Sequence, residues 1–188
     1  MSNSEQQLNS KQTPKRSTIM LVSGDLDKAL LAFEIATGQA AMGMEVTMWF
    51  TLYGVNCLKK PRSIFSLSKW LPKQSGDSKG HKAKTDHFLQ HLLRLLNRDG
   101  ANRIPLSQLN LFGVGPWVLG KIMQRKGMAP LEDLIRYAEE LGIRFRVCQI
   151  CVDALALHME DELVVEAEAL GVSSYTIDTN NAHYNAVI

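Results

Sequence analysis

The chain of 188 residues is 45% hydrophobic and 21% charged, and its formal net charge is +2. This composition fits a globular domain with a sizeable core and excludes a wholly disordered chain. The small net charge gives no sign of a nucleic-acid partner, so we expect none. Three cysteines are too few, and odd in number, for a disulfide-stapled secreted framework.

The N-terminal 17 residues, MSNSEQQLNSKQTPKRS, are polar and lack the apolar segment of a signal peptide. No stretch approaches the ~18 consecutive apolar residues of a transmembrane helix, so we expect no membrane span. We predict a cytoplasmic protein with reduced thiols. It would have a flexible polar tail over 1–17 and a single α/β domain over 18–188.

Hydrophobic periodicity predicts alternating strands and helices along this domain. Strands are expected at 18–22, 45–51, 109–112, 144–148 and 172–177. Helices are expected at 27–43, 81–96, 117–126, 131–141, 154–159 and 160–170, with a polar tail over 178–185. The alternation predicts an α/β fold, with a parallel sheet of about five strands and helices on both faces in a three-layer sandwich.

A basic segment at 59–84 interrupts this pattern. It contains eight Lys and Arg residues and a single acidic residue, Asp77. Prolines and glycines make residues 61–84 an irregular excursion from the domain. The charge suits an acidic or phosphate-bearing partner, or the segment is simply a solvated lysine-rich loop.

Right-handed crossovers bring the carboxyl ends of parallel strands to one edge of the sheet, where ligands bind. We therefore expect residues 23–25, 51–56, 113–116 and 148–151 to meet. The candidate substrate-binding residues among them are Gly24, Asp25, Asn56, Gly113 and Gly115. Asp25 either caps the next helix or orients a neighbouring group. The Gly113–Gly115 pair lacks the third glycine of a dinucleotide-binding motif and favours a tight turn.

Cys148 is the strongest candidate for chemistry, because it lies where a strand is expected to end and a helix to begin. Backbone N–H groups at such a position favour the thiolate over the thiol. A thiolate at this edge can accept sulfane sulfur and pass it on as a persulfide. The alternative is that Cys148 is a buried, inert residue, as free cysteines often are.

Cys148 and Cys151 together form a C-x-x-C pair, which is typical of a redox dithiol or of half a zinc site. Cys57 is the only other cysteine, so no second pair completes a zinc site. We expect no metal and no cofactor, and we expect Cys57 to pack in the core.

Four segments resemble the DsrE/DsrF-like family, and most closely its DsrE-like or peroxiredoxin-like branch. They are GDLDKA at 24–29, ATGQAAMGMEVT at 36–47, WFTLYGVN at 49–56 and CQICVD at 148–153. The resemblance covers roughly residues 18–177. It implies a parallel α/β sandwich, homo-oligomerisation, and cytoplasmic sulfur transfer through a persulfide on Cys148. Cys151 departs from the family pattern, which usually has serine there, and it adds a possible resolving thiol.

Three functions follow as hypotheses. The first is a sulfur carrier or sulfurtransferase, with Cys148 as the persulfide site and TusA-like or rhodanese-like proteins as sulfur donors or acceptors. The second is a thiol redox or regulatory protein that uses Cys148 and Cys151 as a dithiol. The third is a non-catalytic oligomer that binds a ligand or a protein and whose cysteines only pack.

Overall fold

The sheet of this protein has five parallel strands in the order β4-β3-β2-β1-β5. The computed structural model describes residues 14–61, 100–101, 104–108 and 114–188. The strands are β1 (Arg16–Leu21), β2 (Glu45–Phe50), β3 (Arg144–Cys148), β4 (Glu168–Leu170) and β5 (Tyr184–Val187). The predicted α/β class and parallel five-stranded sheet are therefore confirmed.

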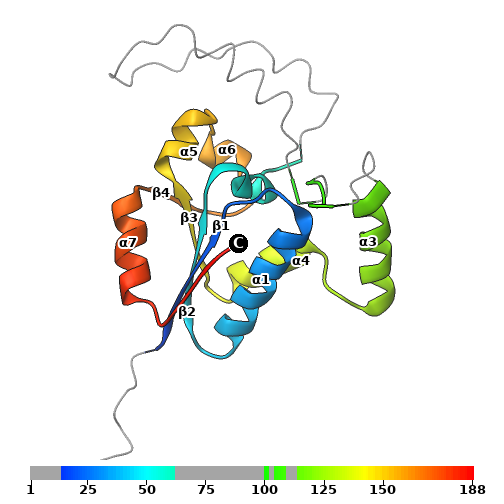
Figure 1. The fold of residues 1–188 in the computed structure, drawn as a ribbon, viewed down its shortest axis with the longest axis horizontal. Coiled ribbons are helices and arrows are strands. Elements are labelled where there is room, and N and C mark those ends of the chain that lie inside the picture. The colour runs from blue at the N-terminus through cyan, green and yellow to red at the C-terminus, as the bar shows by residue number, and fades with distance from the viewer. Residues whose placement is uncertain (1–13, 62–99, 102–103, 109–113) are drawn as a thin grey trace, which may run out of the picture.

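One face of the sheet carries the apolar core. Helices α1 (Leu26–Ala41) and α4 (Leu131–Glu140) lie on this face (Figure 1). Phe33 of α1 packs with Phe50 and Phe145 of the sheet, with ring centroids 6.0–6.3 Å apart. Burial of large aromatic side chains is the main stabilising contribution at such an interface.

The other face is covered by α7 (Val172–Asn181), whose residues are all partly or fully exposed (Figure 1). It contacts the sheet at Trp49 of β2, which is 1% exposed. The Trp49 indole N–H donates to Asp178 over 2.8 Å, and Tyr175 meets the Trp49 ring edge-on. Helices thus cover both faces, as the sequence predicts.

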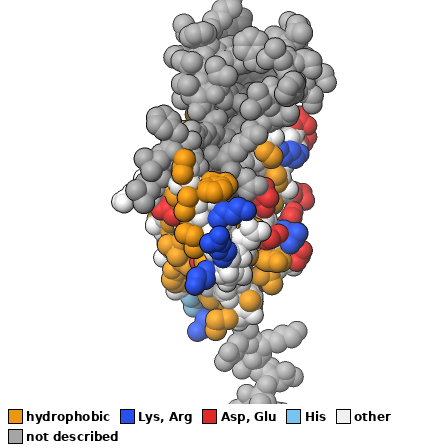
Figure 2. All heavy atoms as spheres, turned by 90° about the vertical axis from the view of Figure 1, so that its right-hand side faces the viewer, with side chains coloured by type: hydrophobic (Ala, Val, Ile, Leu, Met, Phe, Trp, Pro, Cys, Tyr) orange, Lys and Arg blue, Asp and Glu red, His pale blue; other side chains and the backbone are white. Residues whose placement is uncertain are grey.

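The remaining elements connect the layers. They are the 3-10 helix η1 (Leu52–Leu58) and the α-helices α3 (Val114–Lys126), α5 (Gln149–Ala154) and α6 (Met159–Glu162). Helix α3 lies at the side of the molecule away from α5 (Figure 1). Figure 2 looks onto the α3 side and shows basic side chains between hydrophobic ones. No helix in the described part of the chain combines the length and the apolar character of a membrane crossing.

The first part of the pattern agrees with the prediction, since β1, α1, β2, α3, α4 and β3 lie where strands and helices are expected. Strand β1 begins at Arg16, two residues inside the predicted tail. Helix α3 begins at Val114, so Gly115 and Pro116 form its first turn and not a tight turn before it. The predicted strand at 109–112, the helix at 81–96 and most of the basic segment 59–84 lie outside the described residues.

The C-terminal part differs from the prediction. Residues 172–177 form α7 and not a strand, and the predicted helix over 160–170 is replaced by the short α6 and by β4. The predicted helix over 154–159 is wrong as well, because α5 ends at Ala154 and Ala156 adopts a left-handed φ of 47°. The predicted polar tail 178–185 contains the end of α7 and the start of β5.

Tertiary contacts explain these differences. Tyr175 and Asp178 both reach Trp49, and residues three apart share a face only in a helix. The segment after α6 pairs with η1, since Val164 N–H donates to Leu58 O over 2.8 Å and Leu163 bridges Lys59. These long-range contacts override the β-branched and helical propensities of the local sequence.

Candidate functional site

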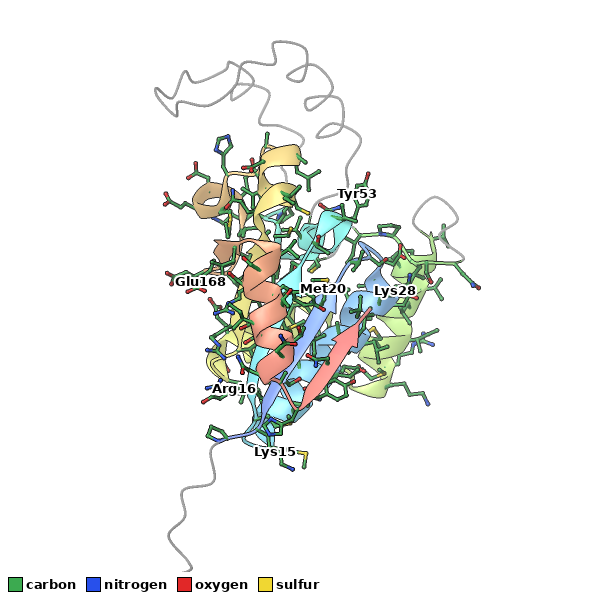
Figure 3. The ribbon with its side chains drawn as sticks, turned by 60° about the vertical axis from the view of Figure 1, so that its left-hand side comes forward. Lys15, Arg16, Met20, Lys28, Tyr53 and Glu168 are labelled. Atoms are coloured by element: carbon green, nitrogen blue, oxygen red, sulfur yellow. The ribbon has the colours of Figure 1, made fainter. Side chains whose placement is uncertain are left out.

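The carboxyl ends of β2 and β3 lie side by side, because Phe50 pairs with Val147 in the parallel register. Thr51 and Cys148 are the next residues on each strand's path. Figure 3 shows Tyr53 of η1 at the same end of the sheet as α5, opposite to Lys15 and Arg16. The structure therefore brings three of the four segments expected to meet to this edge, because 51–56 contacts 148–151 on one side and 23–25 on the other.

Cys148 is the last residue of β3 and the N-cap residue of α5, with an extended backbone at φ −63° and ψ 122°. It is partly exposed, whereas Cys57 and Cys151 are buried. All three thiols are free. Cys148 is thus the most accessible of the three thiols.

Cys151 lies in α5 with its sulfur against the start of η1. The backbone N–H of Leu52 donates to Cys151 Sγ over 3.1 Å, and Thr51 Oγ1 lies 3.1 Å from the same sulfur. Leu52 has a left-handed φ of 49°, which is uncommon for a residue other than glycine. Strained backbone of this kind is concentrated at functional sites.

Gly24 and Asp25 follow β1 and approach η1 from the other side. A Cβ on Gly24 would lie 2.9 Å from Tyr53 O, so this position needs glycine for the loop to pack against η1. Asp25 occupies the N-cap position of α1 without capping it through its side chain. Its carboxylate instead accepts a 2.6 Å bond from the Ser23 hydroxyl and lies 3.5 Å from Lys28 Nζ.

The other predicted binding residues are Asn56, Gly113 and Gly115. Asn56 is buried within η1, and its carbonyl oxygen accepts the backbone N–H of Gly100 over 3.0 Å. Gly115 belongs to the first turn of α3, on the far side of the molecule from α5 (Figures 1 and 3). Gly113 lies outside the described residues.

The contacts of Cys151 with Thr51 and Leu52 are not evident from the sequence. Thr51 lies within the 51–56 segment that was expected at this edge, but nothing in the local pattern marks its hydroxyl or the Leu52 N–H as partners of Cys151. The signal that reveals them is the adjacency of β2 and β3, which is set by long-range strand pairing. In the described part of the chain, no cluster of three or more His, Cys, Asp or Glu side chains could hold a metal ion.

Burial controls the titration of Cys57. Its thiol donates to Gly54 O over 3.1 Å, and burial raises the pKa of this thiol far above the ordinary value of 9.0. Below that value both the folded and the unfolded chain keep the proton. At higher pH the unfolded chain alone releases it, so folding loses stability as the pH rises.

We therefore expect the free energy of unfolding to fall between about pH 9 and pH 10, by up to about 1.4 kcal/mol per pH unit from Cys57 alone. Urea titrations of the native chain and of Cys57→Ala across this range measure the effect. The variant should show the shallower pH dependence, because it lacks this thiol. Equal slopes in the two chains would contradict the burial of Cys57.

One family model and several known proteins match this chain. The model of the DsrE/DsrF/DrsH-like family matches residues 13–86 and 77–187. The chain is 33% identical over 174 residues to the uncharacterized protein YrkE of Bacillus subtilis strain 168, covering 93% of this chain and 97% of that protein. It is 24% identical over 152 residues to the sulfur carrier protein DsrE2 of Allochromatium vinosum, covering 74% and 77%. The solved structure of the ychN protein from E. coli aligns over 93% of this chain and 99% of its own, with 6% identity and a TM-score of 0.46.

Proposed function

The chain belongs to the DsrE/DsrF/DrsH-like family, and on this premise we propose that it is a sulfur carrier that relays sulfane sulfur as a persulfide on Cys148. A relative named as a sulfur carrier protein supports this proposal. The observation that carries it is the placement of Cys148 at the carboxyl end of β3, where it alone of the three cysteines is not buried.

The loading step is a transfer of one sulfur atom between thiols. The Cys148 thiolate attacks the outer sulfur of a donor persulfide, R–S–S–H. A bond forms between Cys148 Sγ and that sulfur while the donor S–S bond breaks, and R–S⁻ leaves with the electron pair. Delivery to an acceptor thiolate is the same exchange in reverse, so no external oxidant or reductant is consumed.

The surroundings of Cys148 suit a protein partner. Three apolar or aromatic side chains near it expose half or more of their surface. They are Ile150 of α5, which lies between the two cysteines of the C-x-x-C pair, and Leu52 and Tyr53 of η1. Exposed apolar side chains grouped at a reactive residue are typical of a docking surface. We propose a TusA-like or rhodanese-like protein as donor or acceptor, with Gly24 and Asp25 at the margin of the contact. Homo-oligomerisation and a cytoplasmic location, which keeps the thiols reduced, belong to the same proposal.

The test is sulfur loading in a Cys151→Ser background, where Cys148 has no neighbouring thiol. We expect intact mass to increase by one sulfur atom after exposure to glutathione persulfide, and peptide mapping to place that atom on Cys148. Adding Cys148→Ser should abolish the gain, because the nucleophile is gone. Adding Cys57→Ala instead should leave it unchanged, because Cys57 is buried and protonated. Sulfur that persists without Cys148, or never appears with it, would contradict the proposal.

A further inference from the structure

Cys151 is held in a way that packing alone does not require. Its sulfur has the Leu52 N–H and the Thr51 hydroxyl at 3.1 Å each, while the residue is 5% exposed. A hydrogen-bond donor aimed at sulfur stabilises negative charge on it. Leu52, which supplies the N–H, has a left-handed backbone conformation with a φ of 49°.

Cys151 is also within reach of Cys148. Cys148 is the N-cap residue of α5, and Cys151 is the third residue of that helix. Residues three apart on a helical turn have Cβ atoms roughly 5–6 Å apart, close enough for a side-chain rotation to join them. The corresponding Cα separation lies within the range that disulfides span, about 4.4–6.8 Å.

We propose that Cys151 is an internal reductant of the Cys148 persulfide, which gives the protein a second activity, the release of hydrosulfide. This inference rests on the proposed function, because it needs sulfane sulfur on Cys148. It assigns to the chain two outlets for the same sulfur. One is transfer to an acceptor protein, and the other is release as a small reduced product when no acceptor is docked.

The step balances without an external reagent. Cys151 loses its proton and its thiolate attacks Cys148 Sγ, the inner sulfur of the persulfide. A bond forms between the two cysteine sulfurs, the bond to the outer sulfur breaks, and HS⁻ leaves with the electron pair and takes up the proton. The sulfane sulfur is reduced and the two cysteines are oxidised to a disulfide. A dithiol reductant then restores both thiols by exchange.

Burial suits Cys151 to this role. A buried thiol meets few donors from solution, so it stays reduced while the partly exposed Cys148 takes up sulfur. Thr51 acts as a positioning residue, because its hydroxyl contacts the Cys151 sulfur over 3.1 Å. Cys57 serves as a matched control, since it is also a buried free thiol but donates to Gly54 O within η1.

The experiment follows hydrosulfide release from the full chain without oxygen. Native chain, Cys151→Ser, Cys151→Ala and Cys57→Ala are each exposed to glutathione persulfide and desalted, and free hydrosulfide is trapped with a bimane reagent over time. We expect the native chain and Cys57→Ala to release about one equivalent and to acquire a Cys148–Cys151 disulfide. Both Cys151 variants should keep the persulfide on Cys148. The serine retains an acceptor for the Leu52 N–H, and the alanine shows whether that matters for folding.

Thr51→Val provides a second readout, because it removes the hydroxyl and keeps the β-branched shape. We expect loading to be unchanged and release to slow by roughly three- to tenfold, the weight of one hydrogen bond. Thr51→Ser should restore the native rate.

The outcomes separate the two proposals. Stable persulfide on the native chain, or release from Cys151→Ser at the native rate, overturns the internal reduction and leaves the sulfur carrier intact. A chain that neither holds sulfur nor releases hydrosulfide overturns both.

Discussion

Replacing Gly54 by alanine is expected to lower the free energy of unfolding by about 3 kcal/mol, because the new methyl group has no room. A Cβ at this position would lie 2.2 Å from the backbone oxygen of Leu21 and 2.8 Å from its carbonyl carbon. These backbone atoms end β1, an interior strand between β2 and β5, and they cannot rotate away as a side-chain tip would. The loop must therefore shift.

The same shift would reach the candidate site. Gly54 N–H donates to Val22 O and to Thr51 O over 3.0 Å each, which fixes the first turn of η1 against β1. That turn presents the Leu52 N–H to Cys151. We therefore expect Gly54→Ala to slow hydrosulfide release as well as to destabilise the fold.

Urea titration monitored by circular dichroism measures the stability change, and Gly38→Ala is the matched control. Gly38 lies within α1, and a Cβ there would meet nothing within 4 Å. Alanine is a better helix former than glycine, so this control should gain up to about 1 kcal/mol. A Gly54→Ala chain as stable as the native one would show that η1 does not pack on β1 as described.

The sequence is informative where each element can be recognised from its own residues. The strand 45–51 is rich in β-branched and aromatic residues, and Gly43 ends the helix before it, so β2 and α1 are found within a few residues of their bounds. The strand ending at Cys148 is found in the same way. The location of Cys148 at the sheet edge can be predicted from these local patterns and the rule for parallel crossovers alone.

Local patterns fail where partners distant in the chain decide the structure. Residues 172–177 contain two β-branched apolar residues, and this pattern predicts a strand. They form α7 instead, because Tyr175 and Asp178 both contact Trp49 and are spaced as on one face of a helix. The contacts of Cys151 cannot be predicted from local patterns for the same reason. Thr51 and Cys151 are 100 residues apart, and only the strand order places them together. Periodicity reports which face is apolar, but it carries no information on which strand is adjacent.

Replacing Asp178 by alanine is expected to cost about 2–3 kcal/mol, because one carboxylate satisfies two groups on the sheet. Asp178 Oδ2 accepts the indole N–H of buried Trp49 and pairs with a guanidinium N–H of Arg146. The Asp178 and Arg146 side chains are only 20% and 16% exposed. Without the carboxylate, a charge and an indole N–H stay poorly solvated under α7.

Neighbouring acids do not replace Asp178. Glu168 lies 3.3 Å from Arg146 Nε, yet that nitrogen is buried without a hydrogen-bond partner. Glu168 is 67% exposed, so water screens its charge. We therefore expect α7, which has no buried residue of its own, to loosen in Asp178→Ala and to expose Trp49.

The measurement is urea unfolding together with hydrogen exchange over α7, and two further variants make it specific. Asp178→Asn keeps an acceptor for the Trp49 indole but removes the charge, so its loss should lie between the native chain and Asp178→Ala. Asp133→Ala removes a partner of Arg136 at 2.9 Å on the exposed surface of α4, and it should cost less than about 1 kcal/mol. If the Asp178 and Asp133 variants lose equal stability, the ion pair beneath α7 is solvated. In that case Tyr175 and the apolar part of Trp49 hold the helix on the sheet.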